Sequence, residues 1–162
     1  MNPESILSYL TIVSNQNIYL NLVMHIITFL ALPSIYVFRN IWLKKAIFNG
    51  LVCTLTLMVT VNAFINGNPF HMVTFGILLG FALMELIIGR NQVLISASHN
   101  NVNTFAAFIF LFIGVWYPEF VHTNPLMFLF LSPMGIVPCP TLIVVLSPVS
   151  YTHLTLPTKR IV

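Results

Sequence analysis

Long apolar runs separated by short polar breaks dominate the chain. A helix needs about 20 apolar residues to cross the ~30 Å hydrocarbon layer of a bilayer. Three runs approach or meet that length without a charge in their middle: Ile18 to Phe38, Ala46 to Ile65, and Phe70 to Ile88. A fourth, Thr104 to Tyr117, is shorter but ends in two aromatic residues, which favour the headgroup level. A fifth begins near Thr141. The pattern predicts an all-α, polytopic transmembrane helical bundle with about four complete spans and a truncated fifth.

The segment before the first span has the features of a helix start. Asn2 is a capping amide, Pro3 presets the first φ, and Glu4 faces the positive end of the helix dipole. Apolar residues then follow at helical spacing on one face. Two interpretations stay open, an interfacial helix that lies on the membrane and a frayed terminus.

An apolar run too short to cross the membrane, Leu126 to Leu131, lies between the fourth and fifth spans. Four prolines flank it: Pro125, Pro133, Pro138 and Pro140. A re-entrant or interfacial loop fits, with its backbone polar groups hidden in protein because lipid cannot satisfy them. An ordinary outer loop that lies over the bundle fits equally well.

The composition agrees with a membrane location. Of 162 residues, 58% are hydrophobic and 6% are charged, whereas soluble domains carry roughly a quarter charged residues. The formal net charge of +3 is spread thinly, and no basic cluster is larger than the pair Lys44 and Lys45. These numbers exclude a soluble globule and a nucleic-acid-binding protein. The expected partner is the lipid bilayer, and the length allows one domain.

The C-terminal tail breaks the hydropathy pattern. Val149 to Thr158 back-translates into a string that resembles the transposon end and primer site of a sequencing-library adapter. We therefore expect a transmembrane domain over residues 1–147, truncated inside a helix, and a sequencing artefact over residues 148–162. A natural polar tail is the alternative. Without Lys159 and Arg160 the chain keeps four basic and three acidic residues.

The positive charges predict an orientation. Arg39, Lys44 and Lys45 lie in the first loop and Arg90 opens the third, whereas the second and fourth loops contain no Lys or Arg. Cytoplasmic loops carry the excess of Lys and Arg in multi-pass proteins. The pattern therefore places loops one and three in the cytoplasm and the N-terminus outside.

Two passages resemble a known family. One combines Phe64-Ile-Asn-Gly-Asn-Pro69 with Phe75-Gly-Ile-Leu-Leu-Gly80, and the other is Ser132-Pro-Met-Gly-Ile-Val-Pro-Cys-Pro-Thr141. Together they resemble an uncharacterised family of bacterial integral membrane proteins, a domain of unknown function in which a Pro-Cys-Pro-Thr motif opens a late transmembrane helix. The order of elements matches over most of residues 1–147. The resemblance implies further spans beyond the end of this chain and implies no activity.

Glu85 is the sharpest candidate for chemistry because an ionisable group inside a span is expensive and needs a partner or water. It lies near the predicted cytoplasmic end of the third span. One interpretation is an interfacial carboxylate that pairs with Arg90, Lys44 or Lys45. The other is an ion or proton path.

Three polar residues, Asn21, His25 and Thr28, share one face of the first span. Such residues serve mostly as hydrogen-bonding contacts between helices, and a metal or proton role is the alternative. The chain has no His pair at i, i+4 and no HExxH motif. We therefore expect no metal and no cofactor.

Small and polar residues also repeat along the second span, at Asn49, Cys53, Thr56, Thr60 and Ala63. On the third span, Gly76 and Gly80 form a GxxxG pair. Small residues let helix backbones approach closely, so these two faces are predicted to form internal contacts of the bundle. A dimer face at the GxxxG pair, and hence a helix partner or homo-oligomer, is the alternative.

Cys139 lies between two prolines at the predicted start of the fifth helix. Helix amide dipoles would stabilise a thiolate there, so a reactive thiol is one interpretation. A rigid helix entry with a small side chain is the other. Cys53 lies inside a span, far from this edge, so a disulfide is not expected.

Three functions remain compatible with the sequence. The first is a non-enzymatic membrane module, either a partner subunit or a structural bundle, because nearly every polar residue has a packing explanation. The second is a small transporter or channel with Glu85 in an ion or proton path. The third is a membrane-embedded enzyme that uses Cys139.

Overall fold

The structure, a computed structural model, describes residues 3–16, 18–88, 101–117 and 124–153. All the secondary-structure elements in these ranges are helices, which confirms the all-α prediction. The elements are α1 (Pro3–Gln16), α2 (Ile18–Val37), α3 (Ile41–Ile65), α4 (Pro69–Ile88), α5 (Asn101–Val115), the 3-10 turn η1 (Pro125–Met127), α6 (Phe128–Leu131) and α7 (Pro138–His153).

Three of the described helices are long and apolar enough to cross a membrane. Their spanning segments are Ile18–Ile35, Trp42–Ile65 and Pro69–Ile88. The predicted fourth span is present as α5, which has 15 residues. The predicted fifth is present as α7, whose apolar part is the short segment Pro138–Ser147. Because both are shorter than a full span, the count of four spans and a truncated fifth stays a prediction.

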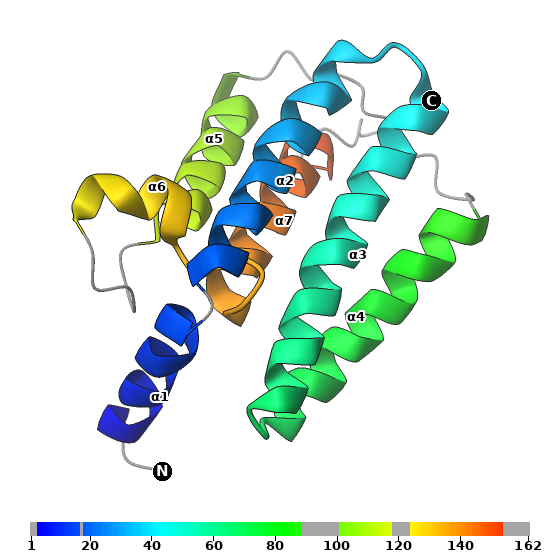
Figure 1. The fold of residues 1–162 in the computed structure, drawn as a ribbon. Coiled ribbons are helices and arrows are strands. Elements are labelled where there is room, and N and C mark those ends of the chain that lie inside the picture. Colours follow the sequence, from blue (N-terminus) through cyan, green and yellow to red (C-terminus); the bar gives the residue numbers. More distant parts are fainter. Residues whose placement is uncertain (1–2, 17, 89–100, 118–123, 154–162) are drawn as a thin grey trace, which may run out of the picture.

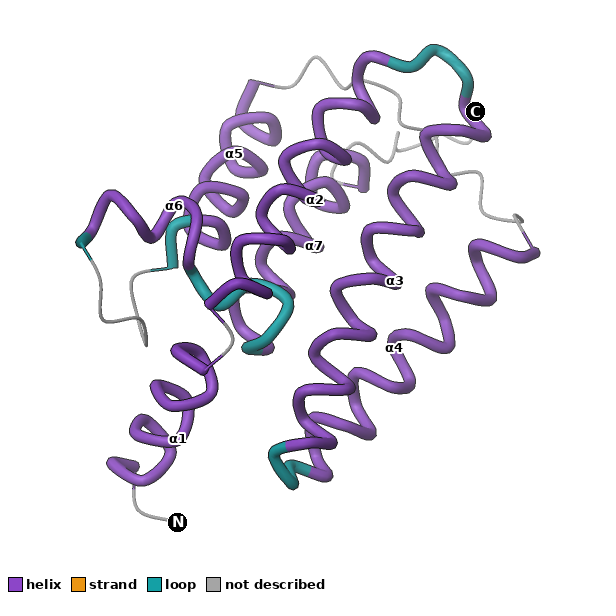
Figure 2. The backbone as a smooth tube through the Cα atoms, viewed as in Figure 1, coloured by secondary structure: helices purple, strands orange, loops and turns teal. Residues whose placement is uncertain are grey.

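Two helix pairs build the bundle. The helices α3 and α4 form an antiparallel hairpin, and α5 packs closely against α7. The two pairs are joined by α2, which packs against α3 and α6 (Figure 1). Figure 2 shows that α1 lies beyond the start of α2, at the end of the bundle where the α3–α4 turn also lies.

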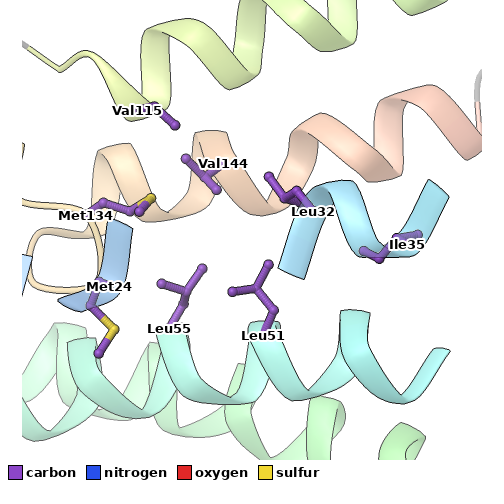
Figure 3. Packing of buried hydrophobic residues seen from close by; sticks show 8 residues of the cluster. All are labelled: Met24, Leu32, Ile35, Leu51, Leu55, Val115, Met134 and Val144. Carbon is purple, nitrogen blue, oxygen red and sulfur yellow. The ribbon is translucent and has the colours of Figure 1, made fainter. Parts of the chain in front are cut away.

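One apolar core connects these helices. Its buried members come from α2, α3, the end of α5, the segment before α7, and α7 itself (Figure 3). They are Met24, Leu32, Ile35, Leu51, Leu55, Val115, Met134 and Val144. Since helices cannot gain much by hiding apolar groups from lipid, the close packing of these side chains is what holds the bundle together.

The start of α3 differs from the prediction. We expected a loop that held both lysines, but α3 begins at Ile41, so Lys44 and Lys45 lie inside its first turns. The reason is Asn40, whose side-chain oxygen accepts hydrogen bonds from the backbone N–H of Trp42 at 2.9 Å and of Leu43 at 3.4 Å. This N-cap satisfies two of the free donors at the helix start.

The predicted small-residue contact between α3 and α4 forms only in part. A Cβ on Gly76 would lie 3.9 Å from the Cγ2 atom of Thr60, so the two backbones approach there. Around Gly80, however, a Cβ would meet no atom within 4 Å, so this half of the GxxxG pair makes no internal contact. Among the described glycines, the closest approach is instead at Gly114 of α5, whose Cβ would stand 2.6 Å from the Cγ2 atom of Val144.

The apolar run Leu126 to Leu131 is helical, a local structure that the prediction of a re-entrant or outer loop did not specify. It forms η1 and the single turn α6. Local hydrogen bonds explain this, because Met127 N donates to the Asn124 carbonyl at 2.8 Å and Ser132 N donates to the Phe128 carbonyl at 3.1 Å. The irregular backbone comes later, between α6 and α7.

Candidate functional site

The segment Ser132–Val137, between α6 and α7, is irregular backbone that is buried along its whole length. Its polar groups bond mostly within the segment: Met134 N donates to the Ser132 carbonyl at 2.7 Å, and Val137 N donates to the Pro133 carbonyl at 2.8 Å. Non-helical backbone inside a membrane protein requires such pairing or a protein environment. A re-entrant loop needs its backbone polar groups to be buried in protein, and this segment meets that requirement.

Thr141, the last residue of the Pro-Cys-Pro-Thr motif, closes this segment. Its hydroxyl accepts a hydrogen bond from Gly135 N at 2.8 Å and donates to the Val137 carbonyl at 2.7 Å. Gly135 has φ +81°, a conformation that residues with a Cβ rarely adopt. The threonine therefore satisfies two backbone groups that this turn leaves outside the helix.

Asn21 ties three elements together. Its side chain is fully buried, and its Nδ2 group donates to the Ser14 carbonyl of α1 and to the Leu131 carbonyl of α6, both at 3.1 Å. The Oδ1 atom is buried and has no hydrogen-bond partner among the described residues. The side chain therefore bonds across elements, as the sequence predicts, and keeps one unused acceptor.

His25 lies one turn further along α2 and is also fully buried. Its Nδ1 atom lies 2.8 Å from the Asn21 carbonyl oxygen, while Nε2 lies 3.0 Å from the Ser132 hydroxyl oxygen and 3.3 Å from the Val115 carbonyl oxygen. The Ser132 hydroxyl is 2.6 Å from the same Val115 oxygen. Val115 is the last residue of α5, so its carbonyl has no partner within that helix.

Thr28 completes the face predicted on α2. It is buried, and its hydroxyl points to the sulfur of Met134 at 3.8 Å, a weak contact. The three residues at helical spacing on α2 thus all face the segment around Ser132–Val137. We call Asn21, His25, Thr28, Ser132 and Thr141 the polar cluster.

The polar cluster lacks the parts of a hydrolytic site. Ser132 and His25 lie within hydrogen-bonding distance, as a nucleophile and base would. However, Ser132 also lies very close to a main-chain carbonyl, which can only accept its proton. In the described residues, no carboxylate is among the hydrogen-bond partners of His25. The ring therefore lacks the Asp or Glu that orients the histidine of a catalytic triad.

Glu85 lies far from this cluster, in the last turn of α4 at the opposite end of the bundle (Figure 1). Its side chain is half-buried, and its buried Oε2 atom accepts no hydrogen bond from Lys44, Lys45 or any other described residue. Arg90, the remaining predicted partner, lies outside the described residues.

Cys139 is exposed and occupies the second position of α7, close in sequence to the cluster but not part of it. Cys53 is half-buried within α3, and both thiols are free. Within the described ranges, no group of three or more His, Cys, Asp and Glu residues is placed to hold a metal ion.

Two members of the site were not singled out from the sequence. Ser132 directly follows the short apolar run, and the Ser-Pro pair there was the available signal. Asn62 of α3 donates from Nδ2 to the Ile136 carbonyl at 3.3 Å. It also lines a small pocket beside the segment, with Asn68, which directly precedes α4, and His71 of α4.

Comparisons of the chain with family models, with curated proteins and with solved structures gave no match. The site is therefore interpreted from its own geometry.

Proposed function

We propose that the chain is a non-enzymatic, multi-pass membrane module, either a partner subunit or a structural bundle. One observation carries this proposal: three side chains of the polar cluster, Asn21, Ser132 and Thr141, donate to main-chain carbonyls. Asn21 donates to two carbonyls, and both Ser132 and Thr141 lie within 2.7 Å of one. Side chains engaged in this way shape the backbone between α6 and α7, and their polar hydrogens are used in that role.

The proposal includes a topology. We assign four spans to α2, α3, α4 and α5, and a truncated fifth to α7, in a bacterial inner membrane with the N-terminus outside. Arg39, Lys44 and Lys45 lie at the end of the bundle opposite α1 and support this orientation (Figure 1). A helix of 15 residues is about 22 Å long, so α5 would need the flanking Trp116 to reach the interface. Membership of the family with the Pro-Cys-Pro-Thr motif remains part of the proposal.

The surface that would meet a partner is the outer face of α4. This helix packs extensively only against α3. Its outer face carries exposed apolar side chains at helical spacing: Phe70, Val73, Ile77, Phe81, Met84 and Ile88. Gly80 is open on the same helix, so a second helix could approach its backbone.

Cysteine cross-linking tests this face directly. In a background with Cys53→Ser and Cys139→Ser, we introduce Phe81→Cys on the outer face and, as a matched control, Ala82→Cys on the buried face. Oxidation in native membranes should join Phe81→Cys to a second copy or to another subunit and leave Ala82→Cys monomeric. Equal behaviour of the two variants would contradict a partner at this face.

A small transporter or channel is the second candidate, and one observation favours it. The Oε2 atom of Glu85 is buried without a hydrogen-bond partner among the described residues, and such a group is a site for a cation or proton. In proteoliposomes, the module should show no H⁺, Na⁺ or K⁺ flux above that of empty vesicles. A flux that Glu85→Gln abolishes, in a variant that still folds, would replace the module proposal with this one.

A further inference from the structure

We propose that His25 is a proton-binding site, and that a second proton on its imidazole holds the Ser132–Val137 segment to the end of α5. This inference goes beyond the proposed function, since a membrane module needs no titrating group. It rests on the positions of the hydrogen-bond donors and acceptors around one buried ring.

Both ring nitrogens of His25 lie beside hydrogen-bond acceptors. Nδ1 lies 2.8 Å from the Asn21 carbonyl oxygen, which can only accept, so Nδ1 must carry a proton. Nε2 lies 3.3 Å from the Val115 carbonyl oxygen, which also can only accept. A neutral imidazole has a single N–H group and satisfies only one of these oxygens.

The Ser132 hydroxyl does not change the number of protons that the ring of His25 needs. Its hydroxyl has one proton, and the distance of 2.6 Å to the Val115 carbonyl oxygen places that proton between these two atoms. The Ser132 oxygen, 3.0 Å from Nε2, is then available as an acceptor. With the imidazolium form, both ring N–H groups and the serine hydroxyl all point at acceptors.

The position of the ring also favours a positive charge. Val115 is the C-terminal residue of α5, and the C-terminal end of a helix carries partial negative charge that stabilises His⁺. Burial opposes the charge, and the surrounding oxygen atoms offset part of that cost.

The other titratable and charged groups are not partners of this ring. Every hydrogen-bond partner of His25 in the described chain is uncharged. The elements around α2 carry these described groups: Glu4 on α1, Tyr19 on α2, Arg39 after α2, Lys44, Lys45 and Cys53 on α3, His71 and Glu85 on α4, Tyr117 after α5, and Cys139 on α7. The aromatic ring of Phe29 lies beside the imidazole of His25, with centroids 6.2 Å apart.

Loss of the proton rearranges the cluster. When Nε2 gives its proton to water it becomes an acceptor, and the Val115 carbonyl then faces a lone pair. The Ser132 hydroxyl can relieve this by turning from Val115 to Nε2. The 2.6 Å bond between the segment and α5 is then broken, so a neutral His25 detaches the segment from the end of α5 and bonds it to α2 instead.

Nitrogen NMR of the histidines measures the proposed proton directly. The full chain, ¹⁵N-labelled at histidine and reconstituted in nanodiscs, is titrated between about pH 5 and pH 8, and His25→Gln identifies the His25 signals. We expect both ring nitrogens to be protonated at the acidic end. A ring with one protonated nitrogen over the whole range would overturn the proposal.

Two variants test the role of Ser132. Ser132→Ala removes the oxygen that accepts from Nε2, so the titration midpoint of His25 should move to lower pH. Thr28→Val is the matched control, because Thr28 is buried on the same face but its hydroxyl contacts Met134 and not His25 in the described part of the chain, and it should leave the midpoint unchanged. Equal midpoints for wild type and Ser132→Ala would overturn the assigned coupling.

Cys139, on the second residue of α7, reports on the segment without any flux measurement. In a Cys53→Ser background, the alkylation rate of Cys139 is measured against pH with and without His25→Gln. At each pH, the rate without His25→Gln is divided by the rate with it. The titration of the Cys139 thiol affects both rates equally and therefore cancels in this ratio. We expect the ratio to change several-fold across the range in which the NMR signals titrate, and a constant ratio would overturn the proposed link. A flux result, by contrast, bears only on the proposed function.

Discussion

Gly135 and Met24 are in such close contact that a Cβ on Gly135 would stand 2.8 Å from the Cγ atom of Met24. This contact joins the irregular segment before α7 to the middle of α2. Because Met24 also belongs to the apolar core, the segment is packed into the bundle rather than laid over it. The polar face of α2, with Asn21, His25 and Thr28, is thereby held at a fixed position against the segment.

Gly135→Ala should destabilise the protein by about 2–5 kcal/mol. Its φ of +81° costs a residue with a Cβ about 1–2 kcal/mol, and forcing the extra carbon against Met24 adds about 1–3 kcal/mol. Unfolding in mixed micelles with increasing dodecyl sulfate, followed by circular dichroism, gives the free energy of unfolding.

Gly67→Ala is the control for this substitution. Gly67 also has a positive φ, +65°, but a Cβ there would meet nothing within 4 Å. Gly67→Ala should therefore lower the free energy of unfolding only by the cost of the positive φ, about 1–2 kcal/mol. Equal losses for the two variants would show that the contact with Met24 is not tight.

Gly114→Ala should destabilise the pair α5 and α7 by about 1–3 kcal/mol through overpacking. The new Cβ would lie 2.6 Å from the Cγ2 atom and 3.0 Å from the backbone nitrogen of Val144, and the backbone atom cannot move aside alone. Gly80→Ala, where a Cβ meets open space, should be neutral or more stable by up to about 1 kcal/mol because alanine favours the helix. The same unfolding assay ranks the two, and the opposite order would contradict the packing of α5 on α7.

Hydrophobic patterning predicts much of this fold. The apolar runs gave the positions of α2, α4, α5 and α7 to within a few residues, because length and composition alone determine where a chain can cross a membrane. The start of α3 was missed because a run of apolar residues does not reveal the N-cap of Asn40. The helical turn α6 was missed because the apolar run does not reveal the local hydrogen bonds at its two ends, from Met127 N to the Asn124 carbonyl and from Ser132 N to the Phe128 carbonyl.

The polar face of α2 was also predictable, but its partners were not. Helical spacing grouped Asn21, His25 and Thr28, and the structure shows all three buried on one side. Their partners are the main-chain carbonyls of Leu131 and Val115, which are distant in sequence. A carbonyl carries no residue-type signal, so spacing alone cannot find it. The importance of Gly114 was missed for a related reason, since close approach depends on which helix lies opposite.

Asn21→Ala should destabilise the chain by about 1–3 kcal/mol, since it leaves two carbonyls without their donor. These carbonyls belong to Ser14 and Leu131, and the side chain that bridges them is fully buried. Thr54→Val is a suitable control, because the Thr54 hydroxyl bonds only to the Gly50 carbonyl of its own helix at 2.8 Å. A loss no larger than that of the control would mean that α1 and α6 do not depend on Asn21.

The free cysteines test the proposed orientation and the enzyme alternative together. Cys139 is exposed at the start of α7, at the end of the bundle that we assign to the outside, whereas Cys53 is half-buried inside α3. A membrane-impermeant maleimide added to right-side-out vesicles should therefore label the Cys53→Ser variant, which keeps Cys139, and leave the Cys139→Ser variant unlabelled.

The rate of this labelling tests whether the thiol is activated, and the side from which it occurs tests the orientation. A helix entry that merely contains a small side chain should react no faster than a free model thiol under the same conditions. A faster reaction would indicate an activated thiolate and favour the enzyme that uses Cys139. If Cys139 were labelled only in inverted vesicles, the orientation would be reversed. Arg39, Lys44 and Lys45 would then lie outside, against the charge rule from which the topology was inferred.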